Sequence, residues 1–574
     1  MTYFIKVAAC VLTAATVFLT GCAGTVNQSG TSSSSSSVSA SETSTVTTTA
    51  STYDYAKKAL DASYNAGAQT INLDKKSGTI SITSAGEYII TGTLADGHIE
   101  VDADDDVQLI LNGAAITSNG SAAIIALNGD LIITLADGTQ NSVTANGITE
   151  EADAAIYASD DLYFNGGGAL TVACTDGDAI AGKDDVAFIS GKYDITAADD
   201  GIRGKDALAI CGGTFTITAE GDGLKSTNDT DDDEGCVYLD GGTFDITAGA
   251  DGVQAETALY VTDAVFDITS GGGVENAVQK TTEKMGGGKQ GGRMQQSGAA
   301  PKMMATAFTT EQTAITDTTA DSFNGLKAGT AINIYGGEVT INSADDAVHT
   351  NGICTISGGS LTLASGDDGV HADDTLNISG GSVTVTQSYE GLEATTINIT
   401  GGECDVTASD DGLNAAGGSD IQSTQFDKFA QGTGALNISG GTVYVDAAGD
   451  GLDANGSIDI SGGTTIVNGP ENSGNGALDY DGTCTVSGGT LIALGASGMA
   501  QAPSGGSQAY IMATLSQTQG ANTEITIQDA SGNTIYTVTS AKSFNSIVAS
   551  TSEMKSGTSY TVTAGNVTGT ATAK

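Results

Sequence analysis

The chain has 574 residues, among them 80 glycines, only 3 prolines and no tryptophan, a composition that suits many tight turns between short strands and disfavours long helices. With 20 Lys and Arg against 69 Asp and Glu, the net charge is −49, which argues against nucleic acid or an anionic membrane surface as a direct electrostatic partner. A polyanion would bind only through bridging cations.

The first segment has the layout of a secretory signal. An apolar stretch from Val7 to Leu19 is too short to span a bilayer. It ends in Leu19-Thr20-Gly21-Cys22, which resembles a bacterial lipobox, in which the cysteine is diacylated and becomes the mature N-terminus. A signal-anchor helix is the competing interpretation. We therefore expect a signal peptide at 1–22 with Cys22 as the lipidation site, on the extracellular face of the cell membrane, so that only the lipid contacts the membrane.

Two segments without a regular period lie between the signal and the repeat. Residues 23–52 are rich in Ser and Thr and predict a flexible tether. Residues 53–145 contain strand-like runs such as Gly86–Gly92 and Val107–Gly113, with an irregular period. We expect an N-terminal cap and the first coils there, because a stack of repeats needs its end covered.

From residue 146 to 494 a short sequence motif recurs about every 22 residues. Each copy has acidic residues, a glycine and an aliphatic residue, and a pair of glycines stands a strand-length away. The aliphatic residues Val348, Val370, Leu392 and Leu413 are 22, 22 and 21 residues apart. Apolar and polar residues alternate around the glycine pairs, as in half-buried strands. One copy cannot bury its own apolar side, so the pattern predicts an all-β, right-handed parallel β-helix with about 22 residues per coil.

The period is interrupted twice and ends before the C-terminus. We expect a disordered Gly- and Met-rich loop at 283–306 and a side loop at 417–434. After a linker at 495–507, residues 508–574 lose the period and show hairpin-like strands, which predicts a small C-terminal β module.

Apolar residues at equal positions of successive copies predict a continuous core. Cys354, Cys404 and Cys484 fall in such apolar columns, and the chain has no Cys-x-x-Cys spacing. Buried free thiols are therefore expected rather than disulfides or a zinc site.

The acidic turns would stack carboxylate on carboxylate if the copies are in register. Turn chemistry explains each one alone, since an Asp can hydrogen-bond its own backbone and glycine supplies a positive φ. Charges about 4.8 Å apart, however, repel by roughly 1 kcal/mol in water and more near a protein surface. Calcium accepts many oxygen ligands in loose geometry and suits such a column. The predicted calcium ligands are Asp199, Asp200, Asp222, Asp345, Asp346, Asp367, Asp368, Asp410, Asp411, Asp450 and Asp453.

A second column follows the aliphatic residue of each copy. Three interpretations stay open: a sugar-contacting groove, a lyase site in which Lys225 or Arg203 removes the α-proton of a uronate beside calcium, or a solvated strand face. The histidines are expected to be surface polar groups. The column comprises Arg203, Lys225, Gln254, His349, His371, Glu393, Asn414 and Asp453.

Several strings in the right order resemble a secreted carbohydrate-binding β-helix family known from clostridial cellulose degraders. The resemblance covers about Ser77 to Leu494, implies a pectate-lyase-like fold, and implies binding of cellulose and polygalacturonate with calcium on the solenoid. The strings that carry it are Ile82-Thr83-Ser84-Ala85-Gly86-Glu87-Tyr88, Asp96-Gly97-His98-Ile99, Leu109-Ile110-Leu111-Asn112-Gly113 and the acidic glycine turns.

The favoured function is calcium-dependent, non-catalytic binding of polysaccharide by a lipid-anchored monomer, with no nucleic-acid partner. A calcium-dependent pectate lyase using Lys225 or Arg203, and a structural stalk or adhesin, are the alternatives. An aromatic content of 5% without tryptophan argues against cellulose, because crystalline glucan is usually gripped by aromatic stacking.

Overall fold

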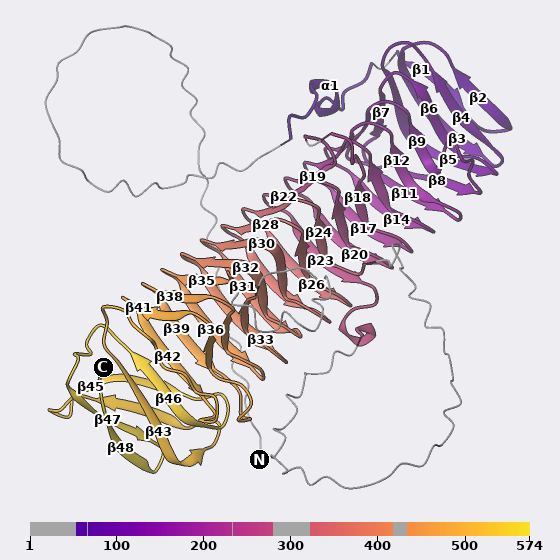
Figure 1. Ribbon diagram of the computed structural model, residues 1–574. Coiled ribbons are helices and arrows are strands. Elements are labelled where there is room, and N and C mark those ends of the chain that lie inside the picture. Colours follow the sequence, from indigo (N-terminus) through magenta and orange to yellow (C-terminus); the bar gives the residue numbers. More distant parts are fainter. Residues whose placement is uncertain (1–52, 66, 232, 279–321, 417–432) are drawn as a thin grey trace, which may run out of the picture. The chain divides into compact units, whose positions relative to one another are not determined.

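The computed structural model describes residues 53–65, 67–231, 233–278, 322–416 and 433–574. In the unit that holds these residues, the chain winds into about 16 turns of a parallel β-helix (Figure 1). Most turns have three short strands, and each strand pairs in parallel with the equivalent strand of the next turn. The all-β parallel β-helix predicted from the repeat is confirmed.

The three strands of a turn define three faces, named here A, B and C. Face A precedes the glycine pair and contains β1 (Gln69–Asn72), β7 (Leu131–Leu135), β10 (Leu162–Gly166), β13 (Val186–Phe188), β16 (Ala207–Ile210), β19 (Cys236–Leu239), β22 (Ala258–Val261), β25 (Ala331–Ile334), β28 (Ile353–Ile356), β35 (Ala435–Ile438), β38 (Ser457–Ile460) and β41 (Thr483–Val486). Face B follows the glycine pair and contains β8 (Gln140–Asn146), β11 (Ala169–Cys174), β14 (Lys192–Ala197), β17 (Thr214–Ala219), β20 (Thr243–Ala248), β23 (Val265–Ser270), β26 (Glu338–Ser343), β29 (Ser360–Ala364), β31 (Ser382–Gln387), β33 (Glu403–Ala408), β36 (Thr442–Ala447), β39 (Thr464–Asn468) and β42 (Thr490–Gly495).

Face C follows the acidic turn and carries the second column of the repeat. Its strands are β2 (Gly78–Ile82), β4 (Gly97–Asp102), β6 (Ile124–Asn128), β9 (Ala154–Ala158), β12 (Asp178–Gly182), β15 (Ile202–Gly204), β18 (Leu224–Ser226), β21 (Val253–Ala255), β24 (Leu326–Ala328), β27 (Val348–Thr350), β34 (Leu413–Ala415), β37 (Leu452–Ala454) and β40 (Leu478–Tyr480). Four longer strands continue round a corner and belong to two faces: β3 (Gly86–Leu94), β5 (Val107–Asn119), β30 (Val370–Ile378) and β32 (Leu392–Ile399).

The core follows directly from the alternation in the sequence. On β17, Phe215 and Ile217 point inward and are buried, while the threonines that alternate with them are exposed. Equal positions of neighbouring coils stack, so Phe215 lies on Phe244 with ring centroids 4.9 Å apart, and Phe244 lies on Phe266 at 4.6 Å. Each coil is therefore stabilised by contacts with its two neighbours rather than by a core of its own.

The cysteines of the predicted apolar columns lie inside the coil. Cys354, Cys404 and Cys484 are fully buried and free. The prediction of buried free thiols at these three positions is confirmed.

The glycine of the acidic turn is required for a different reason from the one predicted. Positive φ occurs at the second glycine of the pairs, for example Gly359 (φ 83°) and Gly381 (φ 76°), and not at Gly223 of the acidic turn. A Cβ on Gly223 would lie 2.6 Å from the carbonyl oxygen of Gly252 in the next coil. Close stacking of coils, rather than a left-handed turn, excludes a side chain there.

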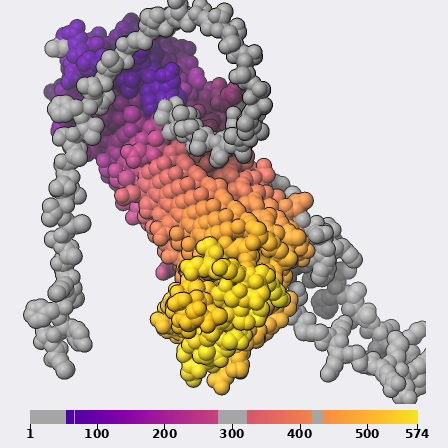
Figure 2. All heavy atoms as spheres, turned by 90° about the vertical axis from the view of Figure 1, so that its left-hand side faces the viewer, coloured from indigo at the N-terminus to yellow at the C-terminus, as the bar shows by residue number. Residues whose placement is uncertain are grey.

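Two other parts of the chain pack on the coil, one along face A and one at the C-terminal end. Ahead of β1, residues 53–65, including the short helix α1 (Lys57–Leu60), lie on face A, where the Tyr55 hydroxyl donates to Asp240 at 3.1 Å. At the other end, β46 (Phe544–Ser550) pairs antiparallel with β42 and with β43 (Tyr510–Gln519). A second sheet follows, of β45 (Thr534–Thr539), β44 (Glu524–Gln528), β47 (Ser559–Ala564) and β48 (Val567–Thr572), in yellow in Figure 2.

Several predictions fall outside the described residues. These are the signal peptide with Cys22, the whole tether, the loop predicted at 283–306 and nearly all of the one at 417–434. The short 3₁₀ helix η1 (Val274–Asn276) precedes the first of these loops. Among the residues that are described, no helix is long and apolar enough to cross a membrane.

Candidate functional site

The acidic turns stack in register at the corner between faces B and C. We call the residue two places before each face-C aliphatic residue the acid ladder; it comprises Asp178, Asp200, Asp222, Asp251, Asn324, Asp346, Asp368, Glu390, Asp411 and Asp450. The backbone N–H of Asp222 donates to Asp200 Oδ1 at 2.9 Å, and that of Asp251 donates to Asp222 Oδ1 at 2.8 Å. In these turns the carboxylate thus binds the next coil, not its own backbone as turn chemistry predicted.

The two acids of each turn differ in exposure. Asp200, Asp222, Asp346 and Asp368 of the ladder are at most 5% exposed. The acids that precede ladder members are more open, since Asp199 is exposed and Asp345, Asp367 and Asp410 are half-buried. Asp411, Asp450 and Asp453 are half-buried as well. Of the acids named here, Asp199 therefore offers the most open carboxylate to solvent.

In the N-terminal half, the second column supplies the counter-charge to the ladder. Lys225 Nζ lies 2.7 Å from Asp222 Oδ2 and 3.1 Å from Asp200 Oδ2. The Arg203 guanidinium bridges Asp178 at 2.6 Å and Asp153 at 2.8 Å. Basic side chains of the protein thus lie directly against Asp178, Asp200 and Asp222 of the ladder.

Lys327 is a member of this column that the sequence analysis missed. Its Nζ lies 3.4 Å from Asp251 Oδ2, and β24 places it in register between Gln254 and His349. The long insertion between Gln254 and Lys327 interrupts the 22-residue period and so obscures the register of Lys327 in the sequence. The signal was present, because Leu326 stands 22 residues before Val348 and is preceded by an Asn-Gly variant of the acidic turn.

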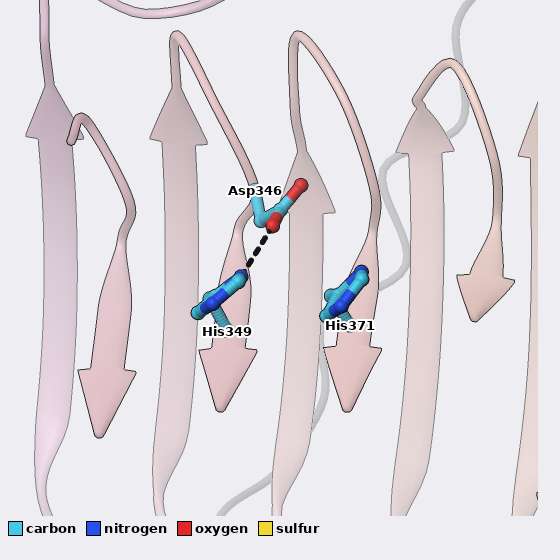
Figure 3. Close-up of side chains that lie close together, drawn as sticks. All are labelled: Asp346, His349 and His371. Carbon is cyan, nitrogen blue, oxygen red and sulfur yellow. Dashed lines mark hydrogen bonds and ion pairs between the residues drawn. The ribbon is translucent and has the colours of Figure 1, made fainter. Parts of the chain in front are cut away.

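The two histidines extend the column as cations, and they are not simple surface groups. His349 Nδ1 lies 2.7 Å from Asp346 Oδ2 and its Nε2 lies 3.1 Å from Asn351 Oδ1. His371 is 3% exposed, with Nδ1 2.9 Å from Asp368 Oδ2 and Nε2 3.1 Å from Asp373 Oδ1. The rings stack with centroids 4.9 Å apart (Figure 3).

Both nitrogens of each ring face an oxygen acceptor, so each ring donates twice and carries a positive charge. Burial alone would lower the pKa of His371, but hydrogen bonds to Asp368 and Glu393 raise it to about 12. The pKa of His349 is also raised, since its bond to Asp346 outweighs burial. Although ligand atoms of Asp346, His349 and His371 lie within 4.8 Å of one another, these rings offer a metal no free lone pair in this state.

Two pockets open on this stretch of the column. One, of about 230 Å³, lies over Lys225, Gln254 and Lys327. The other, of about 280 Å³, lies over Arg203 and Asp153. Because both are lined by Asp199, Asp200 and Lys225, they adjoin and form one polar groove across successive coils.

This groove falls within a stretch that matches a known family. The family model described as "Carbohydrate-binding domain-containing protein" matches residues 76–369, just over half of the chain. The chain belongs to this carbohydrate-binding domain family.

Two other proteins are similar to this chain over shorter stretches. A carbohydrate-binding domain-containing protein of Acetivibrio thermocellus is 31% identical over 203 residues, which are 33% of this chain and 64% of that protein. The chain thus matches less than two thirds of that relative's length. A solved structure, the gadolinium derivative of the polysaccharide lyase-like protein from C. thermocellum, is 29% identical, with a TM-score of 0.34 over 35% of this chain and 90% of that one.

The family match and the basic residues of the second column end in the same region. The match stops at residue 369, and His371 is the last basic residue of the column among those described. Beyond it the column reads Glu393, Asn414, Asp453 and Asp479, in register. The family match therefore covers the basic residues of the column from Arg203 to His349.

Proposed function

We propose that the chain is a lipid-anchored, monomeric protein of the cell surface that binds a polysaccharide, pectin-like polygalacturonate or a cellulose-like glucan, with the help of calcium and without cleaving it. Membership of the carbohydrate-binding domain family supports the ligand class. The observation that carries the proposal is the polar groove around Lys225, in which carboxylates and cations alternate over successive coils. Such a surface offers donors and acceptors to sugar hydroxyls and a cation to a uronate carboxylate.

The residues present fit calcium in the family-matched region. Carboxylate oxygens of Asp178, Asp199 and Asp200 lie within 4.8 Å of one another. Those of Asp345, Asp346 and Asp367 do so too. These oxygen-only sets suit calcium better than zinc, and a bound calcium ion would supply positive charge that bridges the protein to an acidic glycan.

The geometry supports binding rather than lyase chemistry. A lyase base must be neutral before it takes a proton. Burial alone would lower the pKa of Lys225, but Asp222 and Asp200 raise it above its ordinary value. Arg203 is held between Asp178 and Asp153. Neither side chain is prepared to remove an α-proton.

Calorimetry with galacturonate oligomers and pull-down on cellulose, each with calcium and with chelator, test the proposal. Gln254→Ala removes a side chain that lines the pocket and forms none of the ion pairs, so we expect weaker glycan binding with unchanged folding. Thr218→Ala, an exposed position on face B, is the matched control. Absence of both ion and glycan uptake by the wild type would refute the proposal, and unsaturated product from polygalacturonate that Lys225→Ala abolishes would establish the lyase instead.

A further inference from the structure

A pocket of about 570 Å³ lies between the last coil of the solenoid and the C-terminal β module. This volume is within the range of roughly 300–1,000 Å³ that is usual for small-molecule sites, which occur preferentially where two structural units meet. It also exceeds the volumes of about 230 and 280 Å³ in the groove. The pocket is lined by Ser487 after β41, by residues 506–509 ahead of β43, by residues 552 and 554–556 between β46 and β47, and by Lys574.

The pocket combines an apolar base with walls that form hydrogen bonds. Ala509 and Met554, which are 8% and 6% exposed, belong to the apolar core of the C-terminal module. Four serines and Gln508 add hydroxyl and amide groups to the lining. A sugar has the matching features, since its ring presents C–H groups on its faces and hydroxyls at its edge. The lining therefore suits a saccharide.

Hydrogen bonds fix the backbone around the pocket. The Lys555 N–H donates to the hydroxyl of Tyr560 at 2.8 Å, and the Lys574 N–H donates to the carbonyl oxygen of Tyr510 at 3.0 Å. The Gln508 side chain donates to a carbonyl oxygen of the last coil at 2.9 Å. These residues are therefore positioned before a ligand binds, which reduces the entropy that binding costs.

The charge of the pocket is opposite to that of the chain, whose net charge is −49. The only charged side chains that line the pocket are those of Lys555 and Lys574, whereas Asp199 and Asp200 line the groove. Lys225 of the groove lies between two carboxylates, but neither Lys555 nor Lys574 forms an ion pair with a described residue. Both ammonium groups are thus available to donate to an anion.

We propose that this pocket binds a saccharide that carries a carboxylate group, and that it needs no metal ion to do so. The ammonium groups of Lys555 and Lys574 hold the carboxylate by charge-assisted hydrogen bonds, and the serines and Gln508 bind the ring hydroxyls. The site lies outside residues 76–369, which match the family, and depends neither on the proposed groove nor on calcium. A free sugar acid and the end of an acidic polysaccharide share this chemistry.

Calorimetry of the full-length mature protein, desalted after chelator treatment, tests the pocket with galacturonate, digalacturonate and the neutral disaccharide cellobiose. We expect one equivalent of sugar acid to bind without calcium, and no cellobiose. Binding of galacturonate itself would support a free sugar acid as the ligand, and binding of digalacturonate alone would support a chain end. Lys555→Met/Lys574→Met should weaken the binding at least tenfold.

The matched control is Lys76→Met/Lys192→Met, which removes the same charge from two exposed lysines outside the pocket and should keep the affinity of the wild type. Unchanged affinity in Lys555→Met/Lys574→Met, or no binding by the calcium-free wild type, would overturn the proposal. Equal affinity for cellobiose or for inorganic phosphate would overturn the assignment to a sugar acid.

A second variant tests the location without a change of charge. Ser507 is exposed and lines the pocket, so the ring of Ser507→Trp should fill part of it, weaken the binding of the sugar acid and leave the thermal stability unchanged. Binding that survives this change would overturn the proposal. Gln254→Ala addresses the groove and should leave the calcium-independent equivalent intact, so failure of the groove and failure of this pocket are distinguishable.

Discussion

Replacement of Lys225 by methionine is the sharpest test of the self-neutralised column. Lys225 is 24% exposed on its side chain and sits between Asp200 and Asp222, whose side chains are 7% and 5% exposed. Removal of one partner of a largely buried ion pair costs about 3 kcal/mol, because a buried charge is left uncompensated. Lys205→Met is the matched control, since Lys205 is 40% exposed, pairs with Asp206 at 2.8 Å, and should cost under about 1 kcal/mol.

The effect should be local, so amide hydrogen exchange of single coils is the assay. A repeat stack opens coil by coil, and the amides of Gly223 and Leu224 bond to the next coil at 3.0 and 3.1 Å. A loss of about 3 kcal/mol speeds their exchange roughly a hundredfold. Burial already raises the pKa of Asp222 to about 6, and loss of Lys225 should raise it further. The effect should therefore shrink as the pH falls through about 6, where folded Asp222 takes up a proton, and grow as the pH rises. Exchange in Lys225→Met that matches Lys205→Met at neutral pH would refute the reasoning.

Three further predictions address the core, the histidines and the anchor. Phe215→Ala should lower the free energy of unfolding by about 3–5 kcal/mol, measured by denaturant melts, because its ring is fully buried and stacked on Phe244; an unchanged midpoint would contradict this packing. The folded-state pKa of His371 is raised to about 12, so the contribution of its ion pairs to the free energy of unfolding is complete below about pH 6.5 and declines above it, by up to about 1.4 kcal/mol per pH unit. His371→Gln should therefore flatten the fall of stability with pH between about 6.5 and 9. Equal slopes in the variant and the wild type would refute the imidazolium assignment. Cys22→Ala should prevent incorporation of labelled fatty acid and move the protein from the membrane to the soluble fraction; a membrane-bound variant would instead support the signal-anchor helix.

The parts of the fold that repeat could be predicted from the sequence. A period of 22 residues with alternating polarity leaves few alternatives to stacked coils, and it put Val348, Val370 and Leu392 in one column, as their pairing shows. The role of Gly223 could not be predicted in this way. Its restriction arises from the carbonyl oxygen of Gly252, which comes close only when the next coil is in place.

The chemistry of the column depended on contacts between coils, which a single copy of the repeat does not show. The sequence gives the spacing of Asp222 and Lys225, but not that Lys225 reaches the carboxylate of the preceding coil as well as its own. Likewise, His371 resembles an ordinary surface residue until Asp368, Asp373 and Glu393 are found around its ring. The repeat thus indicates that acids stack, whereas the basic side chains that lie against those acids become visible only when neighbouring coils are in place.

Register makes the ladder a single electrostatic system, because each carboxylate has another above and below it. The chain compensates with Arg203, Lys225, Lys327, His349 and His371, and among the described residues of the column no basic side chain follows His371. Face C keeps its register here, since Val370, Leu392 and Leu413 are paired in successive strands. Where no basic side chain of the described residues pairs with the stacked acids, burial and neighbouring carboxylates raise the pKa values of Glu390, Asp411 and Asp453 to about 8, so these groups hold protons at neutral pH that free carboxyls release.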